Sequence, residues 1–175
     1  TYNLVDEKQV ERICRSMSKA ARVFVCGMGS SGLAAREMEL RFMRIGLDIT
    51  SMDHSDMIRM RGVFQDENCL VFGVSISGEK EEVLYLLEEA HKRGARTVML
   101  TARNRPDFDA FCDEVVLLPS LLHLNHGNVI SPQFPILLLT DILYSYYLSQ
   151  DPYKKEVLHD STLRALEKGR REKVM

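Results

Sequence analysis

Five short apolar runs, each bounded by turn residues, alternate along this chain with stretches of helical periodicity. We interpret these runs as β-strands over Val23–Cys26, Leu47–Met52, Cys69–Val74, Thr97–Thr101 and Glu114–Leu118. Strands that are separated by helices pair in parallel, and a parallel sheet is buried on both faces. The sequence therefore predicts an α/β fold, a three-layer sandwich in which helices flank a five-stranded parallel sheet.

The intervening and flanking segments predict the helices that cover this sheet. The first lies between Val5 and Ala21 and is amphipathic. The others are expected over Ser31–Ile45, Asp53–Arg61, Glu79–Arg93, Pro106–Phe111, Phe134–Leu148 and Pro152–Lys173. The sequence contains neither internal repeats nor low-complexity linkers, so we expect residues 1–175 to form a single domain.

The helix expected over Phe134–Leu148 also bears on assembly. It is apolar around most of its circumference, and such a helix must be covered on more than one side. One small sheet covers only one side. A partner subunit would supply the second cover, so we expect a homodimer or a higher homo-oligomer.

Charge and hydropathy exclude several classes of protein. Lys and Arg total 23 against 25 for Asp and Glu, so the net charge of -2 provides no overall attraction for a nucleic acid. No apolar run approaches the roughly 20 residues of a membrane span, and residues 1–8 lack the pattern of a signal peptide. We therefore expect a cytoplasmic domain without a membrane partner.

The cysteines indicate no special chemistry. The chain has 4 of them, far apart and without a CxxC pair, and Cys26 and Cys69 lie inside predicted strands. Buried thiols of this kind are inert, so we expect structural cysteines, no disulfide, no metal and no cofactor.

Two loops that follow predicted strands carry glycine and serine together. Gly27–Gly32 has the sequence GMGSSG, and Ser75–Lys80 has the sequence SISGEK; each leads directly into a predicted helix. Backbone amides and hydroxyls at a helix N-terminus are suitable donors to a phosphate. Since ligands of open parallel sheets bind at the carboxyl ends of strands, these loops are the candidate site.

Two other interpretations of the loops are open. The first loop matches G-x-G-x-x-G, and Asp48 or Asp53 lies where a dinucleotide-binding acid would hold a ribose. That interpretation leaves the second serine-rich loop unexplained, and the chain is too short to include a second substrate-binding unit. Alternatively, the hydroxyls only cap the helices.

The order of these motifs resembles the sugar isomerase (SIS) domain, a phosphosugar-binding, flavodoxin-like fold. The similar segments are GMGSSG, SISGEKEE, GARTVMLTARN and DEVVLL, which together extend over most of the chain. The resemblance implies phosphosugar-binding roles for Gly29, Ser30, Ser31, Ser75, Ser77 and Gly78. The family often has Thr two residues after that last glycine, and here the residue is Lys80.

Within this family, the C-terminal third resembles RpiR-type bacterial transcriptional regulators more than the stand-alone isomerases. The segment from Ile130 to Tyr144 resembles the tail of these regulators, and residues 5–27 resemble their linker helix, so residues 1–21 would be linker and first helix. The resemblance implies a sugar-phosphate sensor whose DNA-binding helix-turn-helix domain lies upstream and is absent from this chain. An aldose-ketose sugar-phosphate isomerase is the alternative.

A few charged or imidazole side chains complete the candidate set. His123 and His126 are three apart in one loop and are candidate contacts to the sugar. Glu79, Glu81 and Glu82 would either move protons or stabilise a helix N-terminus, and the second role is favoured. Lys80 either contacts the phosphate or points into solvent.

Overall fold

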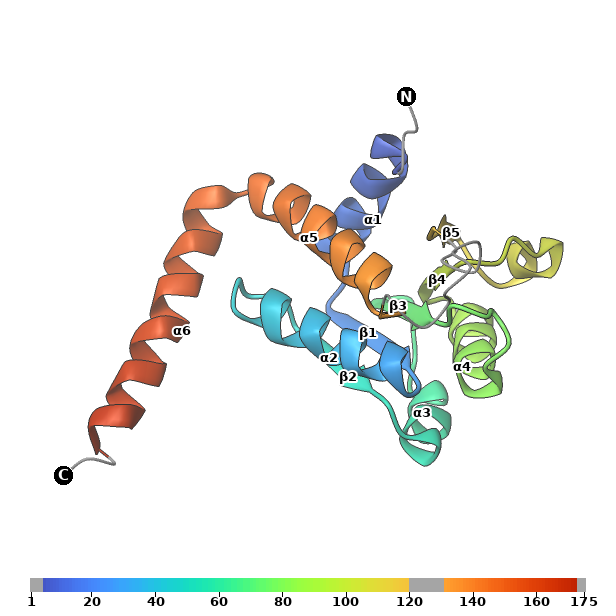
Figure 1. Cartoon of the computed structure of the whole chain (residues 1–175), viewed down its shortest axis with the longest axis horizontal. Helices are drawn as coiled ribbons and strands as arrows, with labels where there is room; N and C mark the ends of the chain where they lie inside the picture. The colour runs from blue at the N-terminus through green and yellow to red at the C-terminus, as the bar shows by residue number, and fades with distance from the viewer. Residues whose placement is uncertain (1–4, 120–130, 173–175) are drawn as a thin grey trace.

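The computed structural model describes residues 5–119 and 131–172, and it contains the expected five-stranded parallel sheet (Figure 1). The strands lie in the order β2-β1-β3-β4-β5, and every neighbouring pair is parallel. Their bounds are β1 Arg22–Gly27, β2 Ile49–Met52, β3 Cys69–Val74, β4 Arg96–Thr101 and β5 Glu114–Leu117. The predicted α/β fold class is confirmed.

Helices cover both faces of this sheet, which confirms the three layers. Their bounds are α1 Glu7–Lys19, α2 Ser30–Met43, α3 Ser55–Gly62, α4 Glu81–Lys92, η1 Pro106–Ala110, α5 Phe134–Ser149 and α6 Pro152–Glu172. Buried side chains of α1, α2 and α5 form one core with the sheet. Those of α3, α4 and η1 form a second core on the opposite face. The strands are buried nearly throughout because both faces are covered.

The strand order places a switch point at β1. The chain passes from β1 to β2 at one edge and then returns to β3 on the other side of β1. Gly27 at the end of β1 is in register with Val74 at the end of β3. The two loops that the sequence singled out therefore leave the sheet from adjacent positions, where ligands of such sheets bind.

The cysteines are buried and free, in agreement with a structural role. Burial raises the pKa of the Cys26 thiol to about 12 and that of Cys14 to about 11. A thiol with such a pKa is protonated near pH 7 and is a poor nucleophile or metal ligand. No cluster of His, Cys, Asp and Glu suited to a metal ion is found among the residues that the structure describes.

Helix α6 extends away from the rest of the molecule as a long arm (Figure 1). Its first turn is attached to α5 through Lys155, which is buried and donates a hydrogen bond to the carbonyl of Tyr147. The Nζ of Lys155 also lies 3.8 Å from the centre of the Tyr147 ring. Further along, Leu163 and Leu166 are exposed. None of the described helices combines the length and apolar character needed to cross a membrane.

The cover of α5 differs from the expectation. The helix packs against α1 and α2 as well as against the sheet core, so its own chain covers it on more than one side. Helix α1 supplies the second cover of α5, so the expectation that a partner subunit must supply this cover was wrong. Exposed apolar surface is found instead at Phe134 and Leu138 of α5 and along α6.

Candidate functional site

Glycines allow the first loop to turn tightly from β1 into α2. A Cβ at Gly27 would lie 2.7 Å from the backbone carbon and oxygen of Ser31, and one at Gly32 would lie 2.7 Å from the carbonyl oxygen of Gly27. The first turn of α2 is thus pressed against the end of β1. Gly29 precedes α2 with φ 57° and ψ -126°, a conformation that favours glycine.

The serines of this first loop are at least partly exposed. Ser30 is exposed and Ser31 is half-buried, and both belong to the first turn of α2. The backbone N–H of Ser31 donates to the carbonyl of Met28 at 3.1 Å, so the loop is closed by backbone bonds. Within the described residues, neither serine hydroxyl forms a protein hydrogen bond, so capping does not account for them.

The second loop uses its serines differently. Ser75 is buried, and its hydroxyl accepts the backbone N–H of Lys80 at 3.5 Å. Ser77 is exposed, and its hydroxyl accepts the N–H of Glu79 at 3.3 Å. The interpretation that the hydroxyls only satisfy nearby backbone amides therefore applies in part to this loop. A hydroxyl that accepts one bond still has a proton to donate, so both serines keep a donor for a ligand.

A brace from the loop after β4 holds the second loop in place. The Arg105 guanidinium donates to the carbonyl of Gly78 at 3.1 Å, and it is itself held by Asp107 in two hydrogen bonds of 3.0 and 2.6 Å. The hydroxyl of Thr101 donates to the carbonyl of Ile76 at 3.4 Å. These contacts fix the backbone of the serine loop.

Gly78 fits closely into this brace. Its φ is 69°, and a Cβ there would lie 3.0 Å from the Phe108 ring and 3.3 Å from the Thr101 hydroxyl. Gly78 was recognisable as a site residue in the sequence, whereas Thr101 and Arg105 were not. The pairing of Arg105 with Asp107 is local in the sequence, but the contact of Arg105 with Gly78 spans 27 residues and leaves no local signal.

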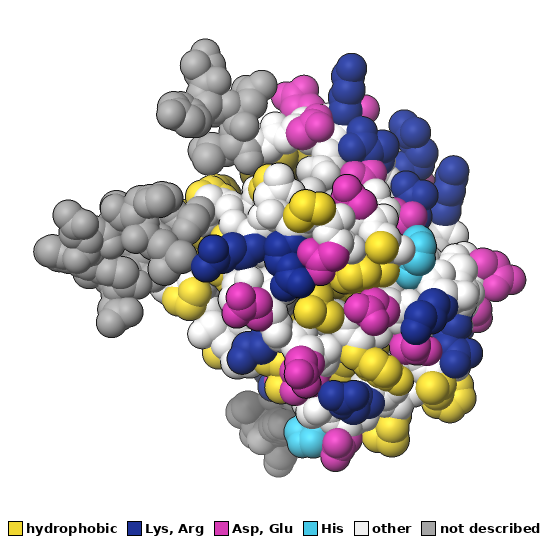
Figure 2. All heavy atoms as spheres, turned by 90° about the vertical axis from the view of Figure 1, so that its right-hand side faces the viewer, with side chains coloured by type: hydrophobic (Ala, Val, Ile, Leu, Met, Phe, Trp, Pro, Cys, Tyr) yellow, Lys and Arg dark blue, Asp and Glu magenta, His cyan; other side chains and the backbone are white. Residues whose placement is uncertain are grey.

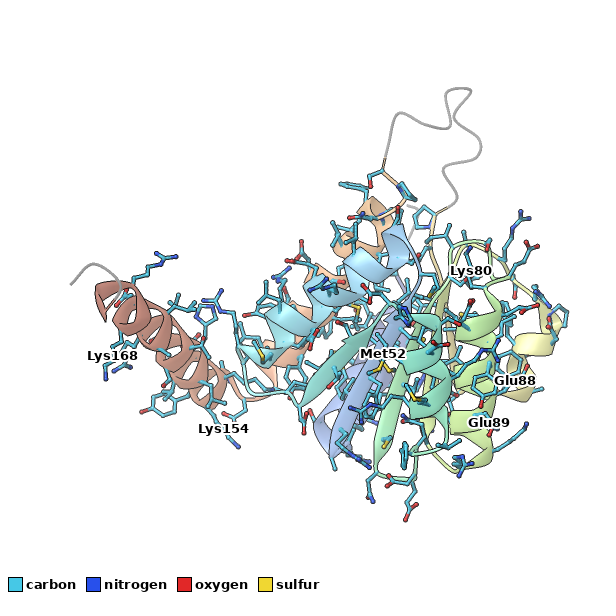
Figure 3. The ribbon with its side chains drawn as sticks, turned by 90° about the horizontal axis from the view of Figure 1, so that it is seen from below. Met52, Lys80, Glu88, Glu89, Lys154 and Lys168 are labelled. Carbon is cyan, nitrogen blue, oxygen red and sulfur yellow. The ribbon has the colours of Figure 1, made fainter. Side chains whose placement is uncertain are left out.

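The charged residues beside the second loop are arranged differently from the expectation. Helix α4 begins at Glu81, so Glu79 precedes the helix and does not belong to its first turn. Lys80 is the N-cap residue, with an extended backbone and an exposed side chain. Figure 3 shows Lys80 at the beginning of α4, with Glu88 and Glu89 further along the same helix. The Lys80 side chain is thus exposed to solvent at the end of the second loop.

The structure brings most of the candidate residues together. The first group, Gly29, Ser30 and Ser31, follows β1; the second, Ser75, Ser77, Gly78 and Lys80, follows β3. The two strands are hydrogen-bonded neighbours. His123 and His126 lie outside the described residues.

This geometry defines a class: a parallel α/β domain whose hydroxyl-bearing loops meet at the switch point of the sheet. The chain belongs to the SIS domain family, which matches residues 16–138. This confirms the family resemblance of the sequence motifs.

The relatives include regulators and enzymes. An HTH-type transcriptional regulator of Haemophilus influenzae is 29% identical over 145 residues, which are 83% of this chain and 50% of the relative. A 3-hexulose-6-phosphate isomerase of Mycobacterium gastri is 30% identical over 140 residues, 80% of this chain and 68% of the relative. The chain spans about half the length of the regulators that it matches.

A solved structure gives a related picture. The NanR protein of Vibrio vulnificus, complexed with ManNAc-6P, superposes with a TM-score of 0.83 and 26% identity, covering 93% of this chain and 61% of that chain. The sugar isomerase domain of an RpiR transcription factor from Sphaerobacter thermophilus has the same fold, with a TM-score of 0.79. The relationship to RpiR-type regulators agrees with the resemblance in the sequence.

Proposed function

We propose that this chain is the effector-binding domain of an RpiR-like transcriptional regulator and that it senses a sugar phosphate. The observation that carries the proposal is the meeting of two serine-bearing loops at β1 and β3, which offers hydroxyls and helix N-terminal amides to one anion. The HTH-type regulators among the relatives are about twice as long as the matched region, which supports a separate DNA-binding domain in the whole protein. The NanR complex supports the ligand class.

A thermal-shift screen tests this proposal. Sugar phosphates and the same sugars without phosphate are compared on the 175-residue chain. A ligand at 100 times its dissociation constant adds about 2.7 kcal/mol to the free energy of unfolding, so a cognate sugar phosphate raises the melting temperature clearly. The unphosphorylated sugars are expected to have little effect. If no sugar phosphate at millimolar concentration raises the melting temperature, the proposal is wrong.

The second candidate function is isomerisation of a sugar phosphate, and the identity to the Mycobacterium gastri enzyme favours it. Isomerisation of a sugar phosphate moves a proton between the two carbons that exchange the carbonyl, which are carbons 1 and 2 for an aldose-ketose pair and carbons 2 and 3 for a 3-hexulose phosphate, so it exposes that proton to exchange with solvent. We expect the chain to bind its ligand in deuterated water without incorporating deuterium at these carbons. Incorporation of deuterium at an enzymatic rate would show that the chain is an isomerase and not a sensor.

Arg105 is expected to act as a positioning residue for this site. Arg105→Met removes the hydrogen bond to the carbonyl of Gly78 and leaves the serine loop freer before the ligand binds. A loss of about 1 kcal/mol corresponds to roughly 5-fold weaker sugar-phosphate binding, measured by calorimetry. Arg164→Met, on the exposed arm, removes the same charge and is the control. Equal affinities of the two variants for the sugar phosphate would contradict the role of Arg105 in positioning the serine loop.

The charge of Lys80 is expected to favour the phosphate. Lys80→Glu should weaken binding by about 10-fold at low salt and by less at moderate salt, because the contribution of an exposed charge is screened. Lys80→Thr should weaken binding less and reduce its salt dependence. Lys154→Glu on α6 makes the same change far from the loops and should have no effect (Figure 3). If Lys80→Glu binds like the wild type at low salt, Lys80 points into solvent and has no role.

We also propose a homodimer or a higher homo-oligomer, on different grounds from those in the sequence. The arm α6 exposes Tyr153, Val157, Leu163 and Leu166, and α2 exposes Leu33, Leu40 and Met43. Exposed apolar side chains in such number are typical of a protein interface. Sedimentation should give at least twice the 20.0 kDa of the chain, and Leu163→Glu/Leu166→Glu should lower that mass. A wild-type mass of one chain at micromolar concentration would contradict this prediction.

A further inference from the structure

A cavity of about 370 Å³ opens at the opposite end of the sheet from the serine loops. Its lining comes from α1 and the residue after it, from the residues that lead into and begin β3, and from the first residue of β4. The lining residues are Arg12, Arg15, Ser16, Lys19, Ala20, Glu67, Asn68, Cys69, Leu70 and Arg96. Because the strands are parallel, their amino ends share this edge and their carboxyl ends share the other. The cavity is therefore separate from the candidate sugar-phosphate site.

Positive charge is concentrated in this cavity. Arg12, Arg15 and Lys19 are spaced by three and four residues and so lie along one face of α1, and Arg96 adds a fourth cation from β4. Glu67 is the one acidic residue of the lining. The complete chain carries a net charge of -2, so this concentration is local. Figure 2 shows Lys and Arg side chains gathered along one edge of the molecule.

One of these cations already has a partner. Arg12 donates to the carboxylate of Glu114 at 2.6 and 3.1 Å, and Glu114 is only 8% exposed. Burial alone would raise the pKa of Glu114, but the hydrogen bonds from Arg12 and Gln9 and the charges of Arg12 and Arg96 outweigh burial and lower it. The side chain of Arg12 is thus held in place at the side of the cavity by its ion pair with Glu114.

The other three cations have no such partner. Across residues 5–119 and 131–172, the ion pairs within 4.0 Å include none formed by Arg15, Lys19 or Arg96. Lys19 in the last turn of α1 stabilises the helix dipole, which explains one cation. It does not explain why Arg15 and Arg96, from two different elements, line the same cavity. Like charges held together repel, and a bound anion would relieve that repulsion.

We propose that this cavity binds a small phosphate-bearing molecule with at least two negative charges. The planar guanidinium of arginine donates two parallel hydrogen bonds to a phosphate, and Arg15 and Arg96, which form no ion pair within 4.0 Å among the described residues, both line this cavity. Ala20 and Leu70 give the cavity an apolar part that suits an uncharged portion of the ligand. The volume is in the range of small-molecule sites. A concave site with Glu67 in its lining suits a small molecule better than a nucleic acid backbone.

An NMR titration of the 175-residue chain with inorganic pyrophosphate at constant ionic strength tests the proposal. Saturable shifts are expected at the amides of Arg15, Asn68 and Arg96. Arg15→Gln/Arg96→Gln removes two positive charges from exposed side chains and should weaken binding at least 10-fold. The control Arg164→Gln/Lys168→Gln removes the same charge from the exposed arm and should bind like the wild type.

Other outcomes would overturn the proposal. These are the absence of saturable shifts, equal weakening in both double variants, and tighter binding of a short DNA duplex than of pyrophosphate at the same salt. Shifts confined to residues 27–32 and 75–80 would also overturn it, since pyrophosphate would then bind at the serine loops. Ser31→Ala/Ser77→Ala, which alters only those loops, should leave the shifts at Arg15, Asn68 and Arg96 unchanged.

Discussion

Replacement of Ser31 and Ser77 together by alanine should weaken sugar-phosphate binding by roughly 100-fold to 10,000-fold, because each hydrogen bond to a charged group contributes about 1.5–3 kcal/mol. The two residues are suitable because their side chains are at least partly exposed and contribute little to the fold. Ser77 accepts one bond from the N–H of Glu79, and Ser31 forms none with the described residues. The loss should therefore appear in the dissociation constant, measured by calorimetry, with an unchanged melting temperature of the free protein.

Two serines on α5 provide the matched control. Ser145 and Ser149 are exposed, and Ser145→Ala/Ser149→Ala removes the same atoms far along the chain from both loops. Ser75 is unsuitable for this test because it is buried and closes its loop on Lys80. Affinity that falls equally in the control, or that stays unchanged in Ser31→Ala/Ser77→Ala, would exclude the two loops as the phosphate site.

Much of the fold was predictable because burial leaves a pattern in the sequence. The runs at Val23–Cys26 and Cys69–Val74 are apolar throughout, since the strands are covered on both faces. The second strand begins at Ile49 and not at Leu47. Leu47 is buried in the connection and its N–H donates to the carbonyl of Phe42, so it has the same apolar signature as a strand residue.

The part of the candidate site that lies in one short sequence motif was predictable. The part that depends on contacts between residues far apart in the sequence was not. Ser75, Ser77 and Gly78 form one short motif after a strand. Arg105 reaches the carbonyl of Gly78 across 27 residues of sequence, and no local pattern predicts such a contact. The expected start of α4 at Glu79 was wrong because Gly78 has φ 69° and Lys80 is extended, which delays the helix to Glu81.

The close approach of β1 and α2 makes the first loop sensitive to a single methyl group. At Gly32, a Cβ would meet the carbonyl oxygen of Gly27 at 2.7 Å and the Cβ of Asp53 at 2.8 Å. Backbone cannot rotate away as a flexible side chain would, so α2 must shift. Gly169, in α6, is also helical, but a Cβ there would meet nothing within 4 Å.

Replacement by alanine should therefore lower the free energy of unfolding at Gly32 but not at Gly169. In both helices alanine gains up to about 1 kcal/mol of helix propensity over glycine. At Gly32 the overpacking costs about 3 kcal/mol, so Gly32→Ala should lower the free energy of unfolding by about 2 kcal/mol and the melting temperature by roughly 4–8 °C. Gly169→Ala should leave the melting temperature unchanged or raise it. Because α2 carries Ser30 and Ser31, Gly32→Ala should also weaken sugar-phosphate binding. Equal stability of the two variants, measured by thermal and urea unfolding, would show that the end of β1 and the start of α2 can separate without cost.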